Sequence, residues 1–293
     1  MLKRQTSGSV VCSNCGRLVG VNDERCFNCG KWNPGLWGYA PMLGRLGGTL
    51  GFSQIVLGGC ILLFLLSYLY APRQGGGGIL RILSPDSSSL YKFGASGALP
   101  VFVAGRWWTV LSAAWLHGGI LHIFMNMWCL RSLMPLVAEL YGTSRLVIIY
   151  TVSSITGFLL TSVLGYAGFF LPIPGFLKGA TITVGASAPL MGLAGALIYY
   201  GRRTGSRALT QQIVQWVLIL VVFGFFVGFV DNWAHLGGLA GGYLAALWLD
   251  PLRPEKPGHM LAALACLALT LLSLVLAFFA GPSWQELMAS IGR

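Results

Sequence analysis

The chain has 293 residues, of which 55% are hydrophobic and only 9% charged, and this composition is far from that of a soluble globular domain. The formal net charge of +11 does not favour nucleic-acid binding, because the basic residues are dispersed between apolar runs. Residues 1–40 contain no apolar stretch of the signal-peptide type, so we expect the N-terminus to be retained. The composition therefore predicts a polytopic membrane protein with a small polar head.

Two Cys-x-x-Cys pairs lie near the start of the chain, Cys12 with Cys15 and Cys26 with Cys29, and a glycine follows each pair. Four thiolates at this spacing suit tetrahedral Zn²⁺, and because no position is left for water the pattern indicates a structural zinc site. Two disulfides are the alternative, but the charge distribution described below places this end in the reducing cytoplasm. Residues 1–33 therefore resemble a zinc ribbon, for which we expect a cytoplasmic protein partner.

Seven apolar stretches follow a linker at residues 34–51, which is rich in proline and glycine. Most are long enough to cross the hydrocarbon core of a bilayer as a helix. The first two are separated by a long segment, residues 71–116, and connections of this length tend to be functional. It ends near Trp107-Trp108, a pair that fits an aromatic belt at the membrane interface as well as a role near a site. The predicted spans are residues 52–70, 118–137, 146–171, 186–200, 213–230, 233–249 and 260–280.

The lysines and arginines predict the orientation of these spans. With the N-terminus in the cytoplasm, most of the 19 basic residues fall on the inner side, including the short loop that carries Arg202, Arg203 and Arg207. Ser187 opens the span that precedes this loop, so it is expected near the outer face, opposite the head. We expect a multi-pass protein of a bacterial cytoplasmic membrane, surrounded by lipid and with its N-terminus inside.

Ser187 is the candidate nucleophile. It follows Gly185-Ala186 at the start of a glycine-lined apolar span, and a serine is a weak nucleophile unless a base lies within hydrogen-bond reach. His235 opens another span at a similar depth. Glycines on both spans, Gly238 and Gly242 among them, allow the two helix backbones to approach closely. A lone histidine in a helix more often has a structural role, and here the neighbouring serine favours a base.

His122 and Asn126 are four residues apart, so they lie on the same side of one helix. Both side chains can donate a hydrogen bond, and two donors facing a nucleophile are what an oxyanion needs. The backbone N–H of Ser187, at a helix start, would add a third. The alternative is that the two side chains bond only to each other or to a neighbouring helix. Of the other histidines, His117 is expected to be solvated and His259 to lie on the inner side.

Three stretches together resemble the rhomboid family of intramembrane serine proteases. They are Trp115-Leu116-His117-Gly118-Gly119-Ile120-Leu121-His122-Ile123-Phe124-Met125-Asn126, Val184-Gly185-Ala186-Ser187 and Asp231-Asn232-Trp233-Ala234-His235-Leu236-Gly237-Gly238. The resemblance covers about residues 52–249 in order, and the motifs are specific in combination. The zinc ribbon lies outside this core and is similar to heads of some bacterial members.

This resemblance implies a fold and a set of roles. The fold class is an all-α polytopic membrane protein, with a rhomboid-like bundle of six helices at 52–249 around a cavity open to the exterior. Residues 250–293 would add a seventh C-terminal transmembrane helix and a short tail. Ser187 would be the nucleophile, His235 the general base and acid, and His122, Asn126 and the Ser187 amide the oxyanion hole. The substrates would be membrane proteins, cleaved in or near a transmembrane helix, with no cofactor in catalysis.

Several positions depart from the family pattern. Ala188-Pro189 replaces the Gly-Ala that usually follows the serine, and Met191 stands where an aromatic residue usually packs on the histidine; methionine would hold the ring less rigidly. Thr109 replaces the arginine after the tryptophan, with Arg106 before the pair instead, and Glu139 falls one residue later than expected. No departure removes a catalytic group, and those at Arg106 and Glu139 bear on the anchoring of the loop and on local stability rather than on the chemistry.

Two other classes of function compete with a protease. One is a catalytically weak or inactive rhomboid-like protein that binds transmembrane segments and uses the zinc head as an adaptor; the intact serine and histidine disfavour it. The other is a channel or transporter, and the lack of paired intramembrane carboxylates and of an inverted repeat in the sequence disfavours that reading.

Overall fold

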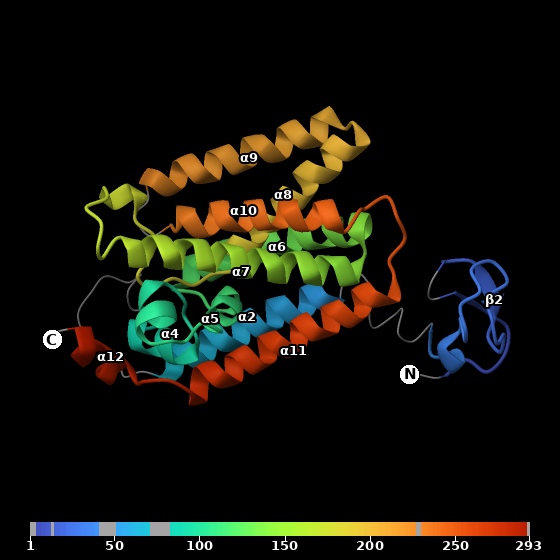
Figure 1. Cartoon of the computed structure of the whole chain (residues 1–293), viewed down its shortest axis with the longest axis horizontal. Coiled ribbons are helices and arrows are strands. Elements are labelled where there is room, and N and C mark those ends of the chain that lie inside the picture. Colours follow the sequence, from blue (N-terminus) through green and yellow to red (C-terminus); the bar gives the residue numbers. More distant parts are fainter. Residues whose placement is uncertain (1–3, 13–14, 41–50, 71–82, 227–229, 292–293) are drawn as a thin grey trace.

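The computed structural model describes residues 4–12, 15–40, 51–70, 83–226 and 230–291. Residues 41–50 of the linker and residues 71–82 of the long segment after the first span lie outside this description. The described part of the chain is a bundle of long helices preceded by a small hairpin domain (Figure 1). It is a mostly helical polytopic membrane protein, as the composition predicts. The long helices are α2 (Gly51–Tyr70), α6 (Ile120–Tyr141), α7 (Thr143–Ala167), α8 (Ser187–Thr204), α9 (Arg207–Phe226), α10 (Asn232–Trp248) and α11 (Pro257–Phe279).

These seven helices coincide with the seven predicted spans, with shifts at the ends. Five of the described helices, α2, α6, α7, α9 and the α11 segment, are long and apolar enough to cross a membrane by length and composition. The helices α8 and α10 are not among them, and both are rich in small residues. They lie inside the bundle, where close packing between helices rather than contact with lipid dominates.

The head is built on a two-stranded antiparallel hairpin, β1 (Ser9–Val11) with β2 (Leu18–Gly20), in which Val10 pairs with Val19. Each Cys-x-x-Cys turn closes in the same way: the amide of Gly16 donates to the carbonyl of Cys12 at 3.1 Å, and the amide of Gly30 donates to the carbonyl of Cys26 at 2.9 Å. Both glycines are left-handed, with φ of +71° and +70°, which explains the residue type expected at those turns. The one-turn helix η1 (Leu36–Gly38) follows.

The long segment between the first two spans is folded where the structure describes it. It contains α4 (Ser87–Phe93), the π-helical turn η2 (Leu99–Val103), α5 (Thr109–Ser112) and η3 (Ala113–Trp115). Asp86 caps α4 by accepting the amide of Ser88 at 3.0 Å. Figure 1 shows these pieces gathered at one end of the bundle, beside the short terminal helix α12 (Trp284–Ile291). We refer to residues 83–117 as the outer loop, after the side of the membrane on which the sequence predicts it; its helices and α12 were not foreseen from the sequence.

The core of the bundle lies where α10 packs against α8 and α7. Glycines make this packing possible. A Cβ on Gly237 would lie 2.7 Å from the Thr156 carbonyl oxygen, and one on Gly195 would lie 2.9 Å from the Tyr243 amide nitrogen. A side chain at either point would push the helices apart, because real Cβ atoms do not approach so closely. The short connection η4 (Gly175–Leu177) lies between α7 and α8.

Candidate active site

Ser187 is the first residue of α8 and follows Gly185-Ala186, and we call residues 185–187 the serine turn. Gly185 has φ of +138°, a conformation that a residue with a Cβ rarely adopts, and its amide donates to the carbonyl of Ala113 at 2.9 Å. Ala186 is fully buried. Pro189 lies in the first turn of α8, where a missing N–H removes no helical hydrogen bond. The departure Ala188-Pro189 is therefore compatible with a helix that starts at the serine.

The helices that carry Ser187 and His235 are neighbours, as the glycine pattern predicts. A Cβ on Gly238 would run into the backbone of Ala188, the residue next to the serine. On the third helix, α7, a Cβ on Gly157 would lie 2.6 Å from the carbonyl oxygen of Ala234 and 2.9 Å from the Cβ of Ala188. Three backbones thus converge beside the two candidate catalytic residues. Gly242 has the same role one turn further along, against Gly192.

His235 is 8% exposed, in the first turn of α10. Its Nδ1 atom is buried without a hydrogen-bond partner among the described residues. The described hydrogen bonds include none between the His235 imidazole and the Ser187 hydroxyl. Catalytic hydrogen bonds are often long in a free enzyme and tighten only with substrate, so the lack of this bond is compatible with a role of His235 as base.

His122 faces the serine across Gly185. The Nε2 and Cε1 atoms of His122 would both lie 2.8 Å from a Cβ on Gly185, and the Ser187 Oγ would lie 3.5 Å from the same point. On the other side of the ring, Nδ1 accepts the amide N–H of Gly118 at 3.3 Å. Because a neutral imidazole has one acceptor and one donor nitrogen, this bond places the ring proton on Nε2, toward the serine.

Asn126 is buried one turn below, on the same face of α6. Its Nδ2 atom donates to the main-chain carbonyl of His122 at 2.9 Å, not to the imidazole. An amide has two N–H donors, so one remains for another acceptor. The described hydrogen bonds join the two side chains neither to each other nor to a neighbouring helix, and their role as oxyanion donors remains a prediction.

His117 is a residue that sequence reasoning placed wrongly. It was expected to be solvated, but it is fully buried. Its Nε2 accepts the amide of Ala186 at 3.5 Å, and its ring meets that of His122 edge-on with centroids 5.2 Å apart. Its hydrogen bond joins the outer loop to the serine turn, and a contact between segments this far apart leaves no periodic signal in the sequence.

Thr161 was missed for a similar reason. It is fully buried on α7, its Oγ1 donates to the Asp231 carboxylate at 2.9 Å, and it accepts the amide of Ala180 at 2.8 Å. Asp231 also caps α10 by accepting the amide of Ala234 at 3.0 Å. One threonine therefore ties the start of α10 to the segment before Ser187. Nothing in the spacing of a threonine within an apolar helix signals such a role.

Met191 is buried in an apolar cluster with Ala194, Ile198 and Val217. This cluster lies between α8 and α9. The expected packing of the thioether on the His235 ring remains a prediction.

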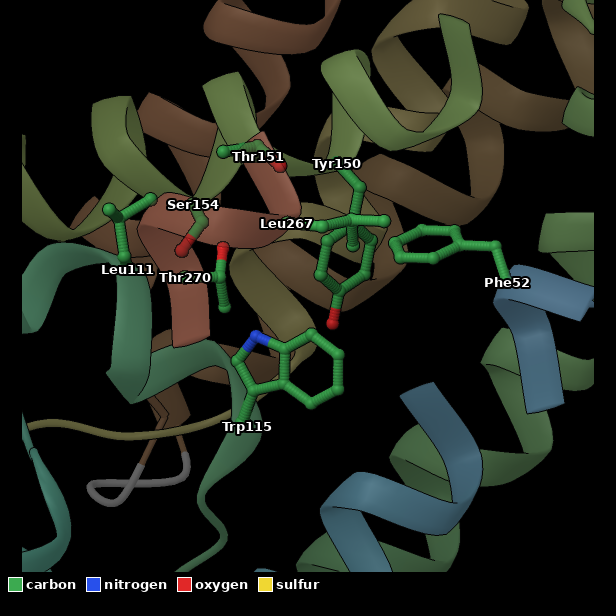
Figure 2. A pocket seen from close by; sticks show the side chains of 8 residues that line it. All are labelled: Phe52, Leu111, Trp115, Tyr150, Thr151, Ser154, Leu267 and Thr270. Atoms are coloured by element: carbon green, nitrogen blue, oxygen red, sulfur yellow. The ribbon is translucent and has the colours of Figure 1, made fainter. Parts of the chain in front are cut away.

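A small cavity lies away from the serine. It has a volume of about 10 Å³, roughly the space of one water molecule. Figure 2 shows Trp115 and Tyr150 projecting into it from η3 and α7, with Phe52 and Thr270 at its edge. The Tyr150 hydroxyl has no hydrogen-bond partner among the described residues. This cavity belongs to the packing between α2, α7, α11 and the outer loop, and none of its lining residues is a candidate catalytic group.

The four cysteines of the head form a cluster that could hold a metal ion, with all sulfur atoms within 4.8 Å of one another. The Sγ atoms of Cys12 and Cys29 lie 3.8 Å apart, and those of Cys15 and Cys26 lie 3.6 Å apart. Zn–S bonds of about 2.3 Å in a tetrahedron place the sulfur atoms roughly 3.8 Å apart, whereas a disulfide needs about 2.05 Å. The geometry fits a four-thiolate metal site and not two disulfides.

Hydrogen bonding to the backbone and burial shift the pKa values of these thiols in opposite directions. The amide of Arg17 lowers the pKa of Cys15 by hydrogen bonding to its sulfur, and such a bond favours the thiolate. Burial raises the pKa of Cys26 to about 11. A bound divalent cation would supply the charge that keeps all four thiols deprotonated.

Residues 104–251 match the model of the rhomboid domain family. The chain is 32% identical over 210 residues to Rhomboid protease GluP of Bacillus subtilis (strain 168), an alignment that covers 69% of this chain and 38% of that protein. It is 31% identical over 183 residues to RHOMBOID-like protein 7 of Arabidopsis thaliana, with 57% of this chain and 51% of the relative covered.

A third relative comes from a protist. The chain is 31% identical over 167 residues to Rhomboid-like protease 5 of Toxoplasma gondii, covering 55% of this chain and 18% of the relative. The chain thus spans about half the length, or less, of these curated relatives.

Proposed function

The chain belongs to the rhomboid family, and from this premise we propose that it is an intramembrane serine protease that hydrolyses a peptide bond in or near a transmembrane helix of a membrane-protein substrate. The observation that carries the proposal is the meeting of His122 and Ser187 at Gly185. A second donor, Asn126, lies on the same face of α6, and His235 lies on the helix packed against α8.

The proposed reaction starts with His235. Its imidazole takes the proton from Ser187 as Oγ bonds to the carbonyl carbon of the scissile peptide. The protonated imidazole then gives this proton to the departing amine, which leaves an acyl-enzyme. A water molecule, deprotonated by the same imidazole, attacks the acyl carbon and releases the acid, and Ser187 regains its proton.

The charge that develops on the carbonyl oxygen needs donors in place before the reaction begins. The proposed donors are His122 Nε2–H, the second Nδ2–H of Asn126 and the amide of Ser187. At the first residue of α8 the serine amide has no helical partner, and the helix dipole adds to its attraction for an anion. Donors held by packing lower the barrier because they need not reorganise when the charge appears.

The proposed catalytic unit is a dyad rather than a triad. Nδ1 of His235 has no partner among the described residues, so no hydrogen bond joins it to the acid Asp231 at the start of the same helix, whose Oδ1 binds Thr161 and the Ala234 amide and whose Oδ2 has no partner there. Packing against the glycine-lined face of α8 would orient the imidazole in place of a carboxylate.

The proposed topology puts the head in the cytoplasm and Ser187 near the outer face. Support comes from α2, whose 20 residues rise about 30 Å, the thickness of the hydrocarbon core. The helix starts where the head is attached and ends at Tyr70, whose ring meets Phe93 of the outer loop. The outer loop in turn contacts the serine turn, so the head and Ser187 would lie at opposite ends.

The proposed metal of the head is structural Zn²⁺, held by Cys12, Cys15, Cys26 and Cys29. The head, residues 1–33, would act as a separate domain. Bound zinc would supply cross-linking of the two Cys-x-x-Cys turns. The rhomboid core would occupy residues 52–249, with residues 250–293 as the additional helix and tail. A cytoplasmic protein is the proposed partner of the head.

An activity-based fluorophosphonate probe tests the protease proposal most directly. The full-length protein in lipid nanodiscs should be labelled, and Ser187→Ala should remove the label. A second function, binding of transmembrane segments without cleavage, draws support from the lack of a hydrogen bond between Ser187 and His235. Absence of labelling, together with retained binding of a transmembrane peptide by the folded protein, would establish that alternative.

A further inference from the structure

Arg106 joins the outer loop to the last transmembrane helix. It is 1% exposed. Its Nη1 donates to the carbonyl of Tyr91 at 2.8 Å, its Nη2 donates to the carbonyl of Ala277, and its guanidinium lies over the Tyr91 ring, 4.2 Å from the centroid. Ala277 lies in the last turn of α11, where backbone carbonyls lack helical partners. The arginine therefore caps the end of α11 from a different element.

Arginine suits this position for three physical reasons. Its planar fork reaches two carbonyls at once, its charge complements the negative end of the α11 dipole, and its flat face stacks on Tyr91. A buried charge beside a membrane is costly and is retained mainly where it has a role. In the described part of the chain its partners are carbonyls and a ring, so it acts on the backbone and not as half of an ion pair.

Further contacts attach the same loop to the same helix. Ser273 Oγ on α11 donates to the carbonyl of Trp108 at 2.7 Å, and the Tyr91 hydroxyl donates to the carbonyl of Pro282 at 3.0 Å. Gly281, just beyond α11, has φ of +90°, and a Cβ there would lie 3.0 Å from the Cγ and Cδ of Arg106. The chain that leaves α11 therefore lies directly against the arginine side chain.

The outer loop also forms the support of the serine turn. Ser96 and Thr183 exchange both backbone hydrogen bonds, at 3.0 and 2.8 Å. Gly185 donates its amide to Ala113 at 2.9 Å, and Ala186 donates to the His117 ring. The backbone from residue 180 to residue 186 thus takes its position from the loop that Arg106 anchors.

We propose that Arg106 is a positioning residue, which uses the end of α11 as a fixed point for the outer loop and thereby sets the position of Ser187. This inference rests on the proposed function, since it assigns a role toward the same nucleophile. In this proposal α11, the seventh long helix, helps to position the nucleophile.

A matched control lies at the other end of the same helix. Arg145 is equally buried and donates to the carbonyls of Asp250 and Arg253 at 2.9 and 2.7 Å, just before α11. It lies beyond the far end of α6, and the 19-residue rise from His122 to Tyr141 is about 29 Å. Loss of Arg145 should loosen α11 without reaching the serine turn.

The experiment compares Arg106→Met, Arg106→Lys and Arg145→Met in full-length protein in nanodiscs. The rate of Ser187 labelling by a fluorophosphonate, normalised to folded protein, should fall about 10- to 100-fold in Arg106→Met, as for a small displacement of a reacting group. It should recover in part in Arg106→Lys, which keeps one donor. In Arg145→Met the labelling rate should stay within about twofold of wild type, even if the Tm of this variant falls as much as that of Arg106→Met.

Amide hydrogen exchange separates this inference from the proposed function. Peptides that cover residues 180–187 should exchange faster in Arg106→Met than in Arg145→Met, whether or not the protein is an enzyme. If wild type is never labelled but this difference is seen, the protease proposal fails and the positioning role stands. The inference would be overturned if folded Arg106→Met showed the labelling rate and the amide exchange of wild type. It would also be overturned if Arg145→Met lost as much labelling rate and amide protection as Arg106→Met. If Arg106→Met does not fold, Arg106→Lys and Gly281→Ala take its place, and their labelling rates and amide exchange are compared with those of Arg145→Met.

Discussion

His122 and Ser187 meet at Gly185: the imidazole Nε2 and the serine Oγ lie 2.8 and 3.5 Å from the single point where a Cβ on that glycine would be. The space between the candidate donor and the candidate nucleophile is therefore created by the missing side chain. A carbonyl that reacted with Ser187 would have to place its oxygen close to this ring.

Gly185→Ala should reduce labelling of Ser187 strongly. The new methyl group would collide with His122, and φ of +138° is strained for alanine. We expect a loss of about 100-fold in labelling rate, as for a displaced reacting group. Gly58→Ala is the control, because a Cβ there meets nothing within 4 Å. Equal rates in the two variants would contradict this account of the turn.

Ser187→Ala and His235→Ala should each reduce cleavage of a transmembrane reporter to background. Because a nucleophile and its base act as one unit, the double variant should be no slower than either single variant. Circular dichroism and thermal unfolding in detergent show whether the variants fold. His259→Ala, a histidine at the start of α11, should keep activity. Additive losses in the double variant would exclude a dyad.

Asn126→Ala should lower kcat about 100-fold, as expected for one oxyanion donor among several, with little change in KM. The buried amide also bonds to the His122 carbonyl, so its removal should lower Tm modestly. Asn126→Asp is the informative companion, because a carboxylate of similar size cannot donate when ionised. Activity in Asn126→Asp equal to wild type would remove Asn126 from the oxyanion hole.

The head should bind one Zn²⁺ per chain, measured by elemental analysis of the purified protein. Binding must displace the proton of Cys26, whose pKa burial raises to about 11 without metal. Zinc affinity should therefore rise with pH and weaken as the pH falls, because protons compete for the thiolates. Cys12→Ser should lose the metal, whereas Cys129→Ser, on α6, should keep it. Full zinc occupancy in Cys12→Ser would place the ion elsewhere.

The two ends of the chain should lie on opposite sides of the membrane. Cysteines introduced at Ser7 and Ser290, in a background with the natural cysteines outside the head replaced, should react with an impermeant maleimide from opposite faces of oriented vesicles. If all seven long helices cross the membrane, the odd number of crossings puts the two ends of the chain on opposite sides. Labelling of both positions from one side would remove the argument that Ser187 opens outward.

The sequence alone determined the class of protein, the seven helices and the candidate residues. Long apolar runs have one stable solution in lipid, a helix that satisfies its own backbone. The motifs around Ser187, His235 and His122 are local, so they can be recognised without knowing how the chain folds. The spacing of the four cysteines likewise indicates a metal site, because two short turns can bring them together with no help from the rest of the chain.

Only the tertiary structure decided how these parts meet. Three sets of hydrogen bonds join segments far apart in the sequence: that of His117 with Ala186, those of Thr161 with Asp231 and Ala180, and that of Arg106 with Ala277. Such polar contacts have no periodicity, since each joins a side chain to a group on a distant segment, and in each set one partner is a backbone N–H or C=O of a kind that nearly every residue possesses. Which of these backbone groups lies within reach is decided by the packing of whole helices, and that packing exists only once the chain has folded.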